Sequence, residues 1–159
     1  MDVFNLTVKQ ISQKIKEAQL TSVDLCKVYI ERIKKFEKDI HAWAHFDEKI
    51  LLEKAEEADN HRRSGKTLGL LHGIPVALKD IIGTLDMPTE CGTVFRKGMS
   101  ASQDAEIVDL LKTEGAIIMG KTATSELAYY SPSKTKNPHD YSRTPGGSSS
   151  GSAAVVASH

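Results

Sequence analysis

The chain has 159 residues, and its 21 Lys and Arg balance its 21 Asp and Glu. With 40% hydrophobic and 26% charged residues, its composition is that of a globular protein, which excludes collagen, coiled coil and long disorder. The balanced charge argues against direct binding to nucleic acid or to a membrane surface, because proteins that bind either one typically carry an excess of basic side chains. No apolar run approaches the roughly 18 residues that span a bilayer, and the N-terminus does not have the pattern of a signal peptide.

The two cysteines, Cys26 and Cys91, provide neither a disulfide framework nor the spacing of metal ligands. The sequence therefore predicts a cytoplasmic location with reduced thiols, and no metal site.

Residues 1–66 are predicted to form an N-terminal helical segment. A first helix carries an apolar stripe at helical spacing, and a second begins at Thr21-Ser22, where hydroxyl groups can cap it. A third runs from near Asp47 to Ser64 and ends at Gly65 after a basic last turn. The stripe of the first helix consists of Val8, Ile11, Ile15 and Ala18.

Residues 67–159 are predicted to begin an α/β core. A buried strand ending at Lys79, a helix from about Asp104 to Glu114 and a second strand at 116–119 favour a mixed, partly parallel sheet with flanking helices. After a loop at 131–150, residues 151–159 resemble the first turns of a buried helix. Nothing ends this helix, so we expect the polypeptide to be cut off inside an element.

Residues 115–122, GAIIMGKT, match the Walker A expression of nucleotide-binding proteins. A phosphate-binding loop must follow a strand and precede a helix. Here the four variable positions are themselves strand-like and a helix precedes them, so we reject nucleotide binding.

Lys79 is the first candidate catalytic residue. It ends an apolar strand, where desolvation would favour the neutral amine, and a neutral lysine is a competent general base. The alternative is a lysine that reaches solvent or pairs with Asp80.

The second candidate is the loop that contains Gly146, Gly147, Ser148 and Ser149. The glycines permit unusual backbone angles, and the serines precede a helix N-terminus suited to an anion or a developing oxyanion. The alternative is a flexible linker, but linkers are seldom followed directly by an apolar run. Neither His72 nor His139 has an obvious orienting carboxylate, so a serine–lysine arrangement without histidine is favoured.

The segments 71–80, LHGIPVALKD, and 145–154, PGGSSSGSAA, together with 115–122 and 125–128, resemble the amidase signature family. The resemblance covers nearly the whole chain and implies that this is the N-terminal part of an amide-hydrolysing enzyme with no cofactor. It also implies that Lys79 is the base, and that Ser148, after a cis peptide bond, relays the proton. The nucleophilic serine of the family would fall beyond His159, so the chain alone is expected to be inactive.

Several alternatives stay open. Ser150 stands where the family often has glycine, and with residues 125–130 this favours a general amidase acting on a small-molecule amide. The first alternative is the A subunit of glutamyl-tRNA(Gln) amidotransferase, and the second is a non-catalytic or degraded binding module. The sequence determines neither the substrate nor the oligomeric state.

Overall fold

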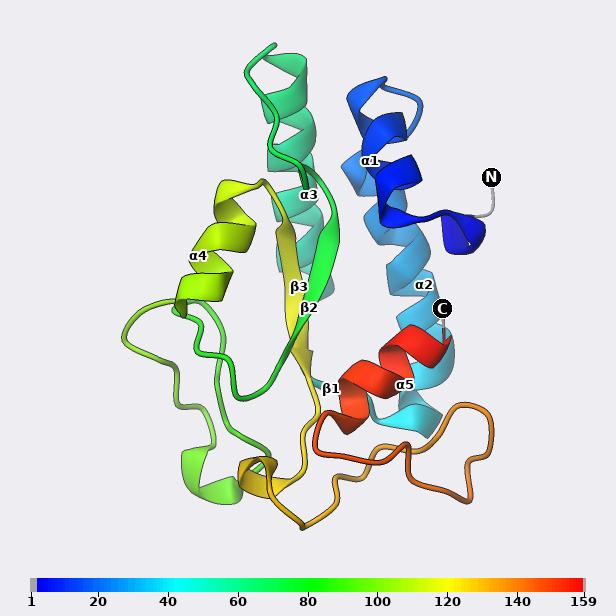
Figure 1. The fold of residues 1–159 in the computed structure, drawn as a ribbon, viewed down its shortest axis with the longest axis vertical. Coiled ribbons are helices and arrows are strands. Elements are labelled where there is room, and N and C mark those ends of the chain that lie inside the picture. Colours follow the sequence, from blue (N-terminus) through cyan, green and yellow to red (C-terminus); the bar gives the residue numbers. More distant parts are fainter. Residues whose placement is uncertain (1–2, 159) are drawn as a thin grey trace. The chain divides into compact units, whose positions relative to one another are not determined.

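The computed structural model describes residues 3–158, which form five α-helices and three β-strands (Figure 1). They group into two compact units, each assembled from separated stretches of chain. The first unit contains the residues up to Ile33 together with 47–76 and 107–119, and the second contains 34–46, 77–106 and the residues from Gly120 onward. The candidate catalytic residues all belong to the second unit.

The helices α1 (Val8–Lys16), α2 (Ser22–Ile40) and α3 (Glu48–Arg63) confirm the three helices predicted within residues 1–66, while the division of the chain at residue 66 stays a prediction. Thr7 and Gln10 form a reciprocal capping box at the start of α1. The Asp47 carboxylate accepts a hydrogen bond from the Ile50 N–H at 3.0 Å and starts α3. Local sequence therefore determines where these two helices begin.

The core of the first unit is a cluster of buried aliphatic side chains from α1, α2 and the segments that precede α1, α2 and β2. Ile11 and Ile15 are one helical turn apart, so folding removes one stripe of α1 from water. The buried members are Val3, Ile11, Ile15, Leu20, Leu25 and Ile74.

The sheet has the order β1-β3-β2, with β1 at Trp43–Phe46, β2 at Pro75–Lys79 and β3 at Ile117–Thr122. β1 and β3 are antiparallel. β2 and β3 are parallel, because the N–H of Ile117 bonds to Ile74 at one end and the N–H of Asp80 bonds to Thr122 at the other. With α4 (Glu106–Thr113) between them in sequence, they confirm the predicted mixed sheet.

Strand β1 was not predicted from the sequence. It has four residues, and its pairing with β3 is irregular between Trp43 and His45. So short a segment between two helices carries no clear period of two, and its extended form depends on the partner strand.

The last helix, α5, spans Ser150–Ser158 and confirms the helix predicted at the end of the chain. It is only partly buried, which corrects the expectation of a buried helix. Gly151 and Ala154 lie on the covered face, whereas the Val156 side chain is 76% exposed.

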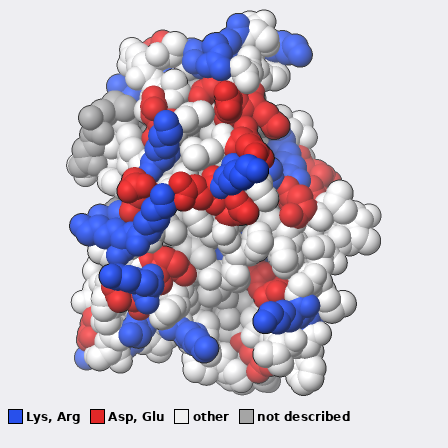
Figure 2. Space-filling view, turned by 180° about the vertical axis from the view of Figure 1, so that it is seen from behind, with Lys and Arg blue, Asp and Glu red and all other residues white. Residues whose placement is uncertain are grey.

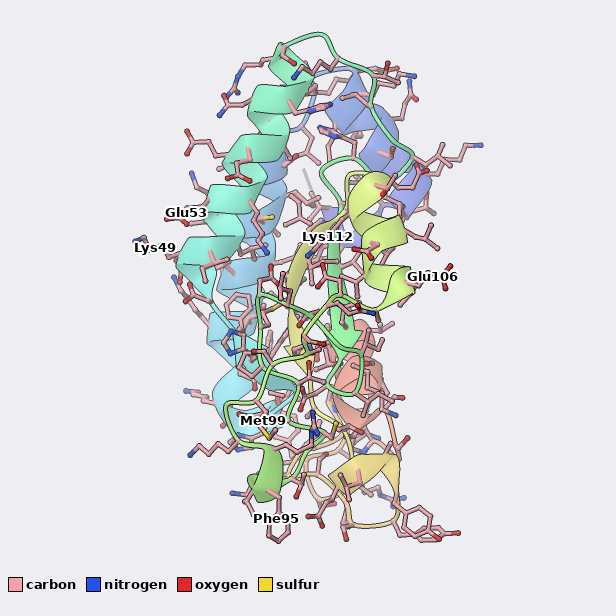
Figure 3. All side chains as sticks on the ribbon, turned by 90° about the vertical axis from the view of Figure 1, so that its left-hand side faces the viewer. Lys49, Glu53, Phe95, Met99, Glu106 and Lys112 are labelled. Atoms are coloured by element: carbon pink, nitrogen blue, oxygen red, sulfur yellow. The ribbon has the colours of Figure 1, made fainter. Side chains whose placement is uncertain are left out.

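Acidic and basic side chains are interspersed on the face shown in Figure 2. On α3, for example, Lys49 and Glu53 are one turn apart and approach to 3.8 Å (Figure 3). No helix among residues 3–158 is long and apolar enough to cross a membrane. The same residues contain no group of three or more His, Cys, Asp or Glu side chains that could hold a metal ion.

His72 makes the stability of the first unit depend on pH. Burial lowers the pKa of its imidazole, and its Nε2 lies 3.0 Å from the carbonyl oxygen of Ala58. Because the pKa is lower in the folded chain, the unfolded chain binds more protons as the solution becomes acidic. The contribution of His72 to the free energy of unfolding is therefore complete above about pH 6.5 and is lost as the pH falls below that value.

We therefore expect the free energy of unfolding to fall between pH 7.5 and pH 5, and the fall to be smaller in His72→Gln. Urea unfolding at both pH values measures this, with the exposed His139→Gln as the control. An equal loss on acidification in the chain and in His72→Gln would contradict the assignment to His72.

Candidate active site

Lys79 and Ser148 are brought together by the fold, although 69 positions separate them in sequence. Lys79 is the last residue of β2 and is partly buried. Its Nζ donates a hydrogen bond to Ser148 Oγ at 2.6 Å. At this distance a proton can pass between the two side chains without a bridging water.

The backbone around Ser148 is held by a hydroxyl and an amide that follow β3. The Ser148 carbonyl oxygen accepts hydrogen bonds from the Ser125 N–H at 3.0 Å and from Thr124 Oγ1 at 3.1 Å. The peptide bond between Gly147 and Ser148 is cis. The serine is therefore presented by a loop that is fixed to the end of the sheet.

The other predicted loop residues lie beside Ser148. Gly146 has φ +90°, a backbone conformation that strongly favours glycine, and a Cβ at either Gly146 or Gly147 would meet no atom within 4 Å. Ser149 is exposed, and its carbonyl oxygen accepts the Ala153 N–H in the first turn of α5. The Cβ positions of these two glycines thus face open space.

Two hydroxyl groups that we did not single out as site residues join the ends of the strands to α5. Thr122 Oγ1 donates to the Leu78 carbonyl oxygen at 3.3 Å and lies 2.7 Å from Ser152 Oγ. Thr122 is buried at the end of β3. The sequence indicates Thr122 only as a threonine at the end of a buried apolar strand. Its hydrogen-bond partners, Leu78 and Ser152, are identified by the structure.

On the other side of these strand ends lie Asp80 and Lys121. Lys121 is fully buried, and its Nζ is 3.9 Å from Asp80 Oδ1. Burial lowers the pKa of Lys121, against the opposing effect of Asp80. Burial raises the pKa of Asp80, against the effect of the backbone N–H groups of Glu90 and Gly92.

This position of Lys121 confirms the rejection of the Walker A match. A phosphate-binding lysine begins a helix after a glycine-rich loop, whereas Gly120, Lys121 and Thr122 all lie in β3. Helix α4 precedes the segment, as predicted.

Ser150, which replaces a glycine common in the resembled family, has a specific partner. Its hydroxyl is buried and lies 2.6 Å from Ser133 Oγ. Ser133 in turn donates to Thr135, which donates to the His41 carbonyl oxygen. The larger side chain is thus accommodated by hydrogen bonds that tie the preceding loop to the start of α5.

A family model described as Amidase matches residues 24–159. The chain is 39% identical to a glutamyl-tRNA(Gln) amidotransferase A subunit of Clostridium acetobutylicum, over 99% of this chain and 34% of the relative. It is 36% identical to the corresponding A subunit of Streptomyces avermitilis, over 99% of this chain and 33% of the relative. The chain thus spans about a third of the length of these relatives.

Solved structures show the same similarity. The native peptide amidase from Stenotrophomonas maltophilia superposes with a TM-score of 0.91 at 32% identity, over 98% of this chain and 34% of that one. A fatty acid amide hydrolase gives a TM-score of 0.86 at 28% identity, over 94% of this chain and 27% of that one. The sequence match, the fold and these relatives together show that the chain belongs to the amidase signature family.

Proposed function

We propose that this chain supplies the base and the proton relay of an amide-hydrolysing centre, with Lys79 as the base and Ser148 as the relay. The observation that carries the proposal is the 2.6 Å contact between Lys79 Nζ and Ser148 Oγ. In the proposed centre the Ser148 hydroxyl group stands between Lys79 and the nucleophile that attacks the substrate carbonyl.

The proposed reaction proceeds through an acyl-enzyme. A serine outside this chain attacks the amide carbon while its proton passes to Ser148, whose own proton passes to neutral Lys79. The C–N bond then breaks, and the departing nitrogen takes a proton back through Ser148. Water hydrolyses the resulting ester by the same relay, so the centre returns to its starting state and needs no cofactor.

The chain spans about a third of the relatives it matches. We therefore propose that these 159 residues are inactive by themselves and that the complete centre draws its nucleophile and oxyanion donors from outside them. Small carboxamides are the proposed substrates. A cytoplasmic location stays a prediction, with which the free thiols of Cys26 and Cys91 are consistent.

A fusion tests the proposed chemistry. Residues 1–159 would replace the corresponding third of the Stenotrophomonas peptide amidase, and hydrolysis of simple aliphatic and aryl amides would be measured. We expect hydrolysis by the fusion, none by residues 1–159 alone, and a loss of at least about 100-fold in kcat for Lys79→Met or Ser148→Ala.

The exposed Lys66→Met serves as the matched control and should keep full activity. Circular dichroism would establish that each variant folds. Full activity in a folded Lys79→Met fusion would overturn the assignment of the base, and a folded but inactive fusion would favour the non-catalytic alternative.

The similarity to amidotransferase A subunits supports a second candidate, release of ammonia from the side-chain amide of glutamine. The buried Ser133–Ser150 pair favours the general amidase instead. The pair requires serine at position 150, and serine in place of the glycine common in the family is the feature that favours a general amidase. Comparing ammonia release from glutamine with hydrolysis of aryl amides by the same fusion separates the two candidates.

A further inference from the structure

Lys121 is a buried cation that the proposed reaction does not use. Its side chain is 0% exposed, and its Nζ donates to the Ile82 carbonyl oxygen at 2.7 Å and to Thr89 Oγ1 at 2.8 Å. Removing an ammonium group from water is costly unless its hydrogen bonds are replaced. Here they are replaced by acceptors from one segment, residues 81–92.

Asp80 holds the same segment from the other direction. Its carboxylate accepts the Glu90 N–H at 3.1 Å and the Gly92 N–H at 3.3 Å, and its carbonyl oxygen accepts the Cys91 N–H at 2.9 Å. With Lys121 opposite, the segment that follows Lys79 is folded back and fastened to the ends of β2 and β3.

The side chains on the two sides of these strand ends contact different parts of the chain. Side chains alternate along extended backbone. Lys79 and Thr122 therefore contact Ser148 and Ser152 on one side, while their chain neighbours Asp80 and Lys121 contact segment 81–92 on the other. The Asp80 N–H bonds to the Thr122 carbonyl oxygen at 3.0 Å and links the strands between the two sides.

We propose that Lys121 and Asp80 are positioning residues that hold the end of β2 so that Lys79 Nζ is aimed at Ser148 Oγ. The catalytic meaning of this inference rests on the proposed function, but the geometry it concerns is present in this chain. Without the Lys121 ammonium, Ile82 and Thr89 of segment 81–92 lose their attachment to β3, and the Lys79 side chain gains other orientations.

The test measures the Lys79–Ser148 contact directly in the chain, without turnover. The solvent-exchange rate of the Lys79 Nζ protons would be followed by ¹⁵N NMR, with the resonance assigned by its loss in Lys79→Arg. We expect exchange to become about tenfold faster in Lys121→Met, and nearly as fast in Thr89→Val, which removes one acceptor and preserves shape. Thr89→Ser keeps the hydroxyl and should restore slow exchange, whereas Lys66→Met should change nothing.

Variants are compared where their backbone amide spectra show a folded chain. Unchanged Lys79 exchange in both folded Thr89→Val and Lys121→Met would overturn the inference and leave the anchor a purely structural role. If Lys121→Met does not fold, the comparison of Thr89→Val with Thr89→Ser decides by itself.

In the fusion described above, the same Thr89→Val change should lower kcat about tenfold and leave KM unchanged. An inactive parent fusion would count against the proposed function, whereas unchanged proton exchange would count against the positioning role. The two failures are therefore distinct.

Discussion

Replacing Gly151 with alanine should lower the free energy of unfolding by about 3 kcal/mol or more. A Cβ at this position would lie 2.3 Å from both the Ala123 nitrogen and the Ala42 carbonyl oxygen. These are backbone atoms, and they are themselves held by a hydrogen bond between the Ala123 N–H and the Ala42 oxygen at 2.7 Å. Neither can move without disturbing the strand ends that carry the site.

The direction of this effect is informative, because helix propensity predicts the opposite. Within a helix, alanine is favoured over glycine by about 1 kcal/mol. Urea unfolding of Gly151→Ala measures the difference, and Ala153→Val, on the exposed side of the same helix, should cost no more than about 0.7 kcal/mol, as the lower helix propensity of valine predicts. Stabilisation by Gly151→Ala would show that α5 is not packed as described.

Replacing Asp59 with alanine should lower the free energy of unfolding by about 3 kcal/mol, since a buried and a partly buried N–H group lose a charged acceptor. Asp59 is 2% exposed and lies in α3. Its carboxylate accepts the Ser22 N–H at 2.9 Å and the Val23 N–H at 3.1 Å, and so caps α2 from another helix.

Asp59→Asn should have an intermediate effect, because the amide keeps one acceptor oxygen but turns a donor towards an N–H group. The control is Glu56→Ala on the exposed face of α3, expected within about 0.5 kcal/mol of the parent. Equal unfolding free energies for Asp59→Ala and Glu56→Ala would contradict the capping role.

Much of the helical structure could be read from local patterns. The cap at Asp47, the basic last turn of α3 and the spacing of Ile11 and Ile15 act within one or two turns, so their effects depend on near neighbours in sequence. The run that ends at Lys79 was recognised as a strand for a similar reason: it is short, apolar and bounded by glycine and proline.

The pairing of Lys79 with Ser148 has a different origin. The sequence supplied both residue types and the glycine-rich loop, and the family resemblance implied their roles. Their 2.6 Å contact depends on the parallel pairing of β2 with β3 and on the attachment of Ser148 to Thr124 and Ser125. Such long-range pairings are not encoded in any window of neighbouring residues.

The sequence by itself determined that this chain has an α/β fold that begins with helices, because helical stripes, caps and apolar strands are local properties. Its motifs supplied Lys79 and the serine-rich loop as candidates, and the family resemblance implied the roles of Lys79 and Ser148. Only the tertiary structure revealed strand β1, the Ser133–Ser150 contact and the buried Asp80–Lys121 pair. The physical reason is that a polar side chain becomes a structural anchor only when folding removes it from water and supplies its partners, and those partners come from distant parts of the chain.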